Sequence, residues 1–146
     1  MYSHYQYIND PYHYRTSSHD AFINYLQKAI NGEFSAISCY EQLAKMAPKS
    51  QLNRIFEIIN DEKMHLQKFS SIYINMTGKK PTYSITEECP NNYRDGVRFA
   101  FNDEQETVDF YLDLADRSND PYVKEAFRRA AADEQNHAVW FLSFMQ

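Results

Sequence analysis

The chain is poor in the residues that make tight turns and thiolate metal sites. Its 146 residues include only 3 glycines and 5 prolines, which favours long helices over a turn-rich β architecture. The two cysteines, Cys39 and Cys89, do not form a Cys-x-x-Cys motif, so neither a zinc ribbon nor a four-cysteine iron site is encoded. One bridge between them is chemically allowed, but we expect a reduced pair.

The chain also lacks a basic surface and long apolar runs. Its net charge is -5 and no basic stripe is visible, which argues against a nucleic-acid-binding surface. No apolar run reaches the roughly 18 residues of a membrane span, so none is predicted. The N-terminus has no apolar stretch typical of a secretory signal. We therefore expect a single domain in the cytoplasm, with room for one core.

Residues 1–18 differ from the rest of the chain. They are rich in tyrosine and histidine, show no helical period and contain Pro11. We expect an extended arm that becomes ordered only where it docks, followed by one bundle domain over residues 19–146. The tyrosines of the arm are Tyr2, Tyr5, Tyr7, Tyr12 and Tyr14.

Beyond the arm, apolar residues recur in four stretches at the 3.6-residue period of an amphipathic helix. The apolar face of the second stretch is expected to include Phe56. Segment 78–92 has no such period, and a connection this long can cross a bundle from end to end. The sequence therefore predicts an all-α four-helix bundle of two helical hairpins joined by a long crossover loop. The expected helices span about 20–46, 48–76, 93–117 and 121–146.

Capping residues support these boundaries. Ser18 or Asp20 offers an N-cap oxygen to the first helix. Pro48 suits the first turn of the second helix, and Gly78 suits the end of that helix. Asp120 precedes a proline, which is the pattern of an N-cap followed by the first helical residue.

One motif, Glu-x-x-His, occurs twice in these helices, each time within the apolar face. Residues three apart share one face of a helix, so both side chains of a motif can reach the same point. Each motif is preceded, at nearly the same interval, by a lone helical glutamate. The six residues are Glu33, Glu62, His65, Glu104, Glu134 and His137.

The predicted turns place these residues at one level of the bundle. In an antiparallel hairpin, two residues lie side by side when they are equally far from the turn. The midpoint between Glu33 and Glu62 falls at the first predicted turn, and the midpoint between Glu104 and Glu134 falls at the second. Because proline and capping chemistry alone predict these turns, the turns independently support a common level for the motifs and their preceding glutamates.

The two halves repeat at further positions. Aligning the lone glutamates brings Tyr40 onto Tyr111, and aligning the motifs brings Asp61 onto Asp133. Each tyrosine lies two helical turns beyond its glutamate, where a phenol can orient a ligand carboxylate and so support catalysis. An ordinary core tyrosine is the alternative. The aspartates are either partners of the histidine rings or solvated surface residues.

Four carboxylates in an apolar face are costly unless they are paired or coordinated. Two divalent cations would neutralise them, and this repeated ligand set is that of a dinuclear site in a four-helix bundle. Carboxylates with one imidazole per metal suit iron or manganese, although affinity alone does not exclude zinc. The alternative is a buried polar network of histidines and glutamates.

These motifs resemble those of the ferritin-like superfamily, and within it the rubrerythrin-type di-iron bundle, over about residues 20–145. The resemblance implies a role for each of the six residues as a metal ligand. The implied roles are terminal carboxylates for Glu33 and Glu104, bridging carboxylates for Glu62 and Glu134, and one histidine per metal for His65 and His137.

Two departures separate this chain from rubrerythrins. Rubrerythrins carry a rubredoxin domain with four cysteines, which this sequence does not contain. They also tend to have a second glutamate in the third helix, where this chain has Thr107. The ligand set therefore looks closer to the six-ligand sets of bacterioferritins and manganese catalases. Bulk iron storage in a cage is not expected of so short a chain.

The resemblance implies a non-haem di-iron oxidoreductase of peroxidase or ferroxidase type. It would react with peroxide or dioxygen, take electrons from an external donor and form a homodimer, with neither nucleic acid nor membrane as a partner. A dimanganese catalase is the second hypothesis. A structural or assembly protein is the third, because the composition of the arm resembles that of some spore-coat proteins.

Overall fold

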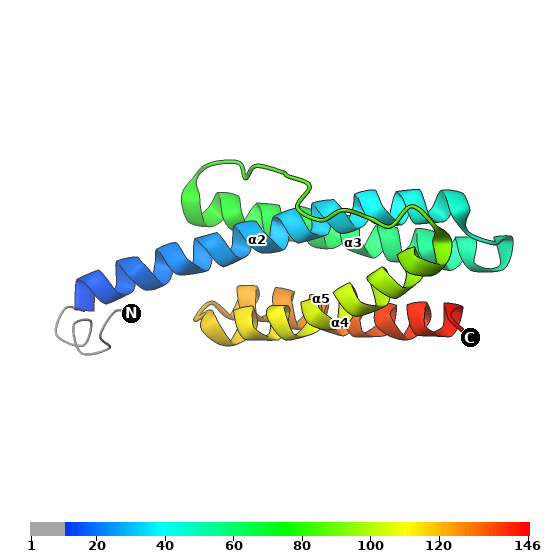
Figure 1. The fold of residues 1–146 in the computed structure, drawn as a ribbon. Helices are drawn as coiled ribbons and strands as arrows, with labels where there is room; N and C mark the ends of the chain where they lie inside the picture. Colours follow the sequence, from blue (N-terminus) through cyan, green and yellow to red (C-terminus); the bar gives the residue numbers. More distant parts are fainter. Residues whose placement is uncertain (1–10) are drawn as a thin grey trace, which may run out of the picture.

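The computed structural model describes the backbone of residues 11–146 and the side chains from residue 19 onward. It contains four long helices, and no strand occurs between residues 11 and 146. Within that range, none of the helices combines the length and the apolar character that crossing a membrane requires. The all-α prediction is confirmed. The helices are α2 (Pro11–Met46), α3 (Lys49–Thr77), α4 (Tyr93–Arg117) and α5 (Pro121–Phe144) (Figure 1).

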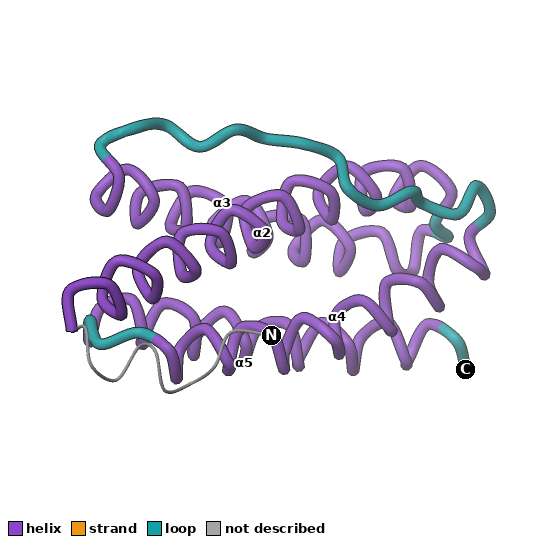
Figure 2. Tube along the Cα trace, turned by 60° about the vertical axis from the view of Figure 1, so that its left-hand side comes forward, coloured by secondary structure: helices purple, strands orange, loops and turns teal. Residues whose placement is uncertain are grey.

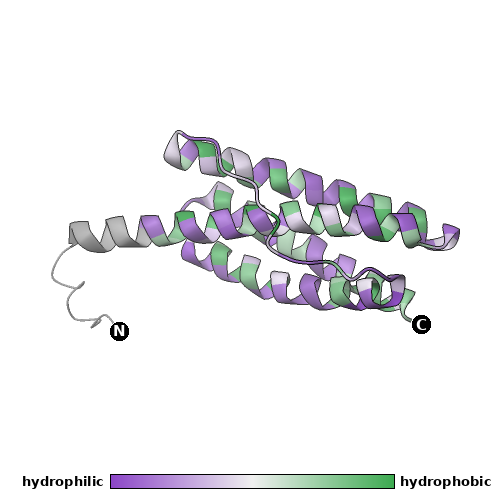
Figure 3. Ribbon diagram, turned by 45° about the horizontal axis from the view of Figure 1, so that its top comes forward, coloured by the Kyte–Doolittle hydropathy of each residue, from purple (hydrophilic) through white to green (hydrophobic). Residues whose placement is uncertain are grey.

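The helices form two hairpins, α2 with α3 and α4 with α5, and the hairpins pack on each other through α2 with α4 and α3 with α5. The loop 78–92 runs along the outside of the bundle from one end to the other, as the crossover prediction requires (Figure 2). Hydrophobic and hydrophilic residues alternate along each helix, which is the pattern of amphipathic helices (Figure 3).

Two of the predicted helix ends are confirmed in detail. The Oδ1 atom of Asp120 accepts hydrogen bonds from the backbone N–H of Tyr122 and of Val123, at 2.8 and 3.4 Å. Gly78 ends α3 in the left-handed conformation at φ 72°, and its N–H donates to the carbonyl of Ile74. Both ends are therefore specified by the residue types that the sequence places there.

The first helix begins earlier than predicted, at Pro11 rather than near Asp20. A proline fits the first turn of a helix because its missing N–H would have no partner there, so Pro11 marks the start and not a break. The N-cap assigned to Ser18 or Asp20 is therefore wrong. Residues 1–10 lie outside the described part of the chain, so the assembly role suggested for the arm and the division at residue 18 stay predictions.

Two apolar clusters fill the bundle, one on either side of the level of the repeated motifs. Phe69 and Phe127 stack in the first cluster with ring centroids 4.5 Å apart. The sequence places Phe56 on the inward apolar face of the second helix, but its side chain is 49% exposed. The buried apolar face of this part of α3 is instead formed by Ile55, Ile58 and Ile59. The buried apolar face of α3 is therefore narrower than the apolar face that the sequence predicts.

Cys39 and Cys89 form a disulfide, which corrects the expected reduced pair. Their Cα atoms lie 5.4 Å apart, although 50 positions separate the residues in sequence. Cys39 belongs to α2, and Cys89 lies near the end of the crossover loop. Spacing in the sequence cannot reveal this pairing because it depends on where the loop crosses the bundle. The bridge fastens the loop to the first helix.

Replacing both cysteines with serine should lower the free energy of unfolding by roughly 2–4 kcal/mol, because the bridge closes a long loop in the unfolded chain. Urea unfolding under oxidising conditions would measure the loss. A thiol reductant should bring the wild-type protein down to the stability of the double variant and leave the variant unchanged. Equal stability of both proteins without reductant would contradict the assignment.

Candidate metal centre

The fold brings all six predicted ligand residues together in the middle of the bundle, between the two apolar clusters. Each helix contributes at least one of them. Every one of these side chains is buried, and the most accessible of the six, His65, is only 6% exposed. They come from α2 (Glu33), α3 (Glu62 and His65), α4 (Glu104) and α5 (Glu134 and His137).

Their ligand atoms form two overlapping groups, and within each group the atoms lie no more than 4.8 Å from one another. Glu62 and Glu134 belong to both groups. The first group adds a glutamate and a histidine from the first hairpin, and the second adds the equivalent pair from the second hairpin. The first pair is Glu33 and His65, and the second is Glu104 and His137. This buried cluster fits a dinuclear metal site.

The histidine rings are held across the two hairpins. The Nε2 atom of His65 lies 2.8 Å from Asp133, and the Nε2 atom of His137 lies 2.8 Å from Asp61. The aspartates are thus partners of the rings and not merely surface residues. Because Nε2 is engaged, each ring turns Nδ1 toward the carboxylates. The distance from His65 Nδ1 to Glu134 is 3.0 Å. An outer partner of this kind fixes the orientation of a metal-binding imidazole.

Each of the two tyrosines also contacts a glutamate of the other hairpin. The hydroxyl of Tyr40 donates to Oε1 of Glu104 at 2.6 Å, and the hydroxyl of Tyr111 donates to Oε1 of Glu33. Both phenols are 1% exposed. The sequence pairs each tyrosine with the glutamate of its own helix, whereas the structure pairs it with the glutamate of the other hairpin. The supporting role predicted for the tyrosines matches these contacts, but with exchanged partners.

Each of the six residues carries one buried polar atom that has no hydrogen-bond partner. Buried polar atoms almost always have partners, so six orphaned atoms at one point need an explanation. Four of them approach one another, since Nδ1 of His65 lies 3.0 Å from Oε1 of Glu134 and Nδ1 of His137 lies 3.1 Å from Oε1 of Glu62, but none of these contacts has hydrogen-bond geometry. A pair of cations would satisfy all six atoms by coordination. The atoms are Oε2 of Glu33 and Glu104, Oε1 of Glu62 and Glu134, and Nδ1 of His65 and His137.

In the absence of metal, the centre holds protons. Burial disfavours the charged imidazole of His65, but its hydrogen bond to Asp133 and the nearby carboxylate of Glu33 outweigh burial and raise the pKa to about 12. His137 behaves alike: Glu104 and Glu62 raise its pKa to about 11 against the effect of burial. Both rings are therefore charged at neutral pH when no cation is bound.

The pKa values of three of the carboxylates are raised, and that of the fourth is lowered. Burial and the charge of Glu62 raise the pKa of Glu33 to about 8 and also raise the pKa of Glu104. Burial and Glu104 raise the pKa of Glu134 well above its usual range. Burial works against the charge of Glu62, yet the close approach of both histidine rings lowers its pKa. Protons thus partly neutralise the charges that cations would otherwise balance.

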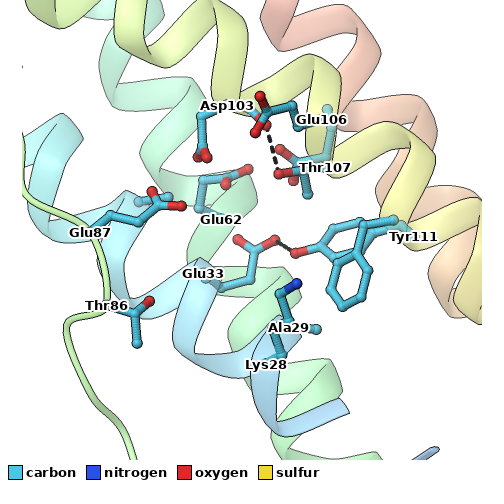
Figure 4. A pocket seen from close by; sticks show the side chains of 14 residues that line it. Lys28, Ala29, Glu33, Glu62, Thr86, Glu87, Asp103, Glu106, Thr107 and Tyr111 are labelled. Carbon is cyan, nitrogen blue, oxygen red and sulfur yellow. Dashed lines mark hydrogen bonds between the residues drawn. The ribbon is translucent and has the colours of Figure 1, made fainter. Parts of the chain in front are cut away.

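Sequence reasoning missed three acidic residues beside the centre. A cavity of about 190 Å³ lies under the crossover loop and is lined by Glu87 of that loop and by Asp103 and Glu106 of α4 (Figure 4). Burial and the neighbouring Glu87 raise the pKa of Asp103 to about 8. Asp103 adjoins a ligand residue in the sequence, but Glu87 lies in an aperiodic segment and gives no signal.

Solved structures share the four-helix fold of this chain. It superposes on a conserved hypothetical protein from Mycobacterium tuberculosis with a TM-score of 0.76, at 13% identity, covering 89% of this chain and 92% of the other. It superposes on a ferritin-like, diiron-carboxylate protein from Bacillus anthracis str. Ames with a TM-score of 0.75, at 20% identity, covering 88% of this chain and 98% of the other. At such identities the likeness shows the fold alone.

The sequence gives the family. The model described as Rubrerythrin matches residues 24–94 and 95–146, two stretches that correspond closely to the two hairpins. The chain therefore belongs to the rubrerythrin family, and the resemblance based on the repeated motifs is confirmed. A relative in Bacillus subtilis (strain 168), the uncharacterized protein YhjR, is 50% identical over 143 residues, with 97% of each chain covered.

Proposed function

We propose that this protein is a non-haem di-iron oxidoreductase that reduces peroxide or dioxygen with electrons from an external donor. One observation carries the proposal: each of the six predicted ligands presents an orphaned buried atom to the same point. Carboxylate oxygens with one imidazole per position suit iron. Membership of the rubrerythrin family supports this choice. A homodimer in the cytoplasm is part of the proposal.

The two overlapping groups of ligand atoms suggest how two ions would be held. Glu62 and Glu134 belong to both groups, so we assign them as bridging carboxylates. The remaining four residues would complete the two positions, with one glutamate and one histidine at each. Glu33 and His65 would bind one ion, and Glu104 and His137 would bind the other.

Two reduced iron ions would supply the electrons that reduce the oxidant. The chain itself provides the surroundings. Tyr40 holds Glu104, and Asp133 holds the ring of His65 with Nδ1 inward, so the ligands are oriented before a cation arrives. The apolar clusters on either side limit the access of water. The cavity of about 190 Å³ reaches Glu33 and Glu62 and has room for a molecule as small as peroxide or dioxygen.

Anaerobic titration of the metal-free protein with ferrous iron tests the proposal directly. We expect about two ions per chain by metal analysis, because the site offers two positions with shared bridging carboxylates. Subsequent addition of peroxide, or of dioxygen in a parallel sample, should produce the ultraviolet absorption of oxidised iron. The faster of the two reactions identifies the oxidant. Failure to bind iron, or binding without oxidation by either reagent, would contradict the proposal.

One observation keeps the dimanganese catalase as a second candidate. Thr107 lines the cavity at the position where rubrerythrins tend to have a further glutamate. Its hydroxyl donates a hydrogen bond to the backbone carbonyl of Asp103. The centre therefore keeps a six-residue ligand set. Manganese-loaded protein that released oxygen steadily from peroxide without any reductant would select the catalase, and an inactive sample would remove it.

A further inference from the structure

One more buried polar atom without a hydrogen-bond partner lies outside the six ligand residues, and it is Oε2 of Glu87 on the crossover loop. Glu87 lines the cavity of about 190 Å³ together with Glu33 and Glu62 (Figure 4). Glu33 is 1% exposed, and its own Oε2 atom has no partner either. Two of the residues that line this cavity thus carry a buried carboxylate oxygen without a hydrogen-bond partner.

The position of Glu87 is fixed by contacts on both sides of it in the chain. The backbone N–H of Thr86 donates to Oγ of Ser35 at 2.8 Å, and Ser35 is fully buried in α2. On the other side, Cys89 is bonded to Cys39 of the same helix. The loop is therefore held against α2 at two points, and Glu87 lies between them. These contacts keep its carboxylate at the cavity.

The titratable groups that line this cavity are mostly acidic. Lys28 is the one basic side chain among the lining residues, and its Nζ atom lies 4.9 Å from the centroid of the Phe110 ring. A concentration of carboxylates in a hollow with apolar walls attracts cations and raises the rate at which they arrive. The lining carboxylates are Glu33, Glu62, Glu87, Asp103, Glu106 and Glu134.

A second cavity, of about 350 Å³, lies between α3 and α5 on another side of the centre. It is larger, but Lys68 and Arg129 line it, and of the six ligand residues it reaches only His65. The ring of His65 is held there by Asp133 through Nε2, so its metal-facing Nδ1 points away from that side. Asp61 and Asp133 also line the second cavity, so its two basic groups face two carboxylates, whereas six acidic residues and a single lysine line the first.

We propose that the first cavity is the route by which divalent cations enter the dinuclear centre, and that Glu87 and Asp103 are the carboxylates a cation meets before it reaches Glu33 and Glu62. This inference rests on the metal-binding part of the proposed function. Glu106 is exposed at the outer side of the cavity, so acidic groups continue from the surface to the centre. Glu87 is thus a transit carboxylate supplied by the crossover loop, and not a ligand of the centre.

Loading of the metal-free protein with Co²⁺ alone, followed by stopped-flow visible absorption, measures the entry rate. We expect Glu87→Gln to slow loading about tenfold at low ionic strength, because one carboxylate of the entry route is lost. The final content should stay at the wild-type value of about two ions per chain. Glu88→Gln is the matched control, since Glu88 lies next to Glu87 on the same loop but is exposed and outside the cavity.

Added salt should slow the wild-type protein more than the Glu87→Gln variant, because the variant has less electrostatic attraction to lose. The entry route would be overturned if Glu87→Gln took up Co²⁺ at the wild-type rate, or if Glu88→Gln were slowed as much as Glu87→Gln. Neither result would contradict the dinuclear centre. A lower final metal content in Glu87→Gln would make Glu87 a ligand and also overturn its transit role. A wild-type protein that takes up no Co²⁺ would refute the centre itself, and the route with it.

Discussion

Replacing Glu62 with glutamine should abolish the tight binding of both metal ions, whereas replacing Glu33 with glutamine should weaken the binding of only one ion. Glu62 belongs to both groups of ligand atoms, and Glu33 belongs to one. An amide cannot supply the two anionic oxygens that a bridging position needs. Mutation of an outer partner of a metal ligand already lowers metal affinity about 10- to 100-fold. Loss of the bridging carboxylate should therefore lower the affinity for each ion by more than about 100-fold. Equilibrium dialysis against Mn²⁺ with metal analysis would measure both ions.

Glutamine keeps the volume of the side chain, so the bundle should remain folded, and circular dichroism should show unchanged helix content. Glu57→Gln is a matched control, because Glu57 lies on the same helix but is solvent-exposed and paired with Arg54. It should bind two ions like the wild type. A Glu62→Gln variant that retained one ion with wild-type affinity would show that Glu62 serves a single position and does not bridge.

Most of the fold follows from local chemistry that the sequence displays. The helical period, the Asp120 cap and the left-handed Gly78 identify the elements and their ends, and the structure confirms these features. The six ligand residues follow from the same source, since a three-residue spacing puts a motif on one face and equal distances from the turns put the helices in register. Features that depend on position within a helix were therefore largely predictable, with the exposed Phe56 and the start of α2 at Pro11 as exceptions.

The remaining features depend on how the two hairpins and the loop pack, which no local pattern records. The exchange of tyrosine partners, with Tyr40 on Glu104 and Tyr111 on Glu33, requires the relative placement of α2 and α4. The disulfide and the place of Glu87 depend on the path of the crossover loop. A loop without periodicity carries no register, so neither could be inferred from residue spacing. These tertiary contacts are the ones that orient and supply the centre.

Removing metal from the protein should lower its thermal stability strongly without unfolding it at room temperature. Any ion that binds only the folded state stabilises it by mass action, and at about 1,000 times its dissociation constant this contributes about 4 kcal/mol per ion. Two ions would together contribute about 8 kcal/mol, which corresponds to a rise in Tm of roughly 15 °C or more for a domain of this size. Thermal unfolding of chelator-treated and Mn²⁺-loaded protein, followed by circular dichroism, would measure the difference.

Glu62→Gln provides the control, because metal should not shift its Tm, and an equal shift in this variant would point to binding elsewhere. The metal-free protein should still fold, because protons take over part of the role of the cations. His65, with a pKa of about 12, and His137, with a pKa of about 11, are then charged beside the ionised Glu62. Burial and the neighbouring carboxylates also raise the pKa values of Glu33, Glu104 and Glu134.

The same protons determine how the effect of metal depends on pH. A cation must displace the protons of His65, His137 and Glu33, whose pKa values of about 12, 11 and 8 all lie at or above neutral pH. Binding therefore releases protons, and metal affinity falls as the pH is lowered. The rise in Tm on adding Mn²⁺ should accordingly be larger near about pH 8 than near about pH 6. A rise that was independent of pH would mean that the bound ion does not compete with these protons, and so does not occupy the site formed by the six residues.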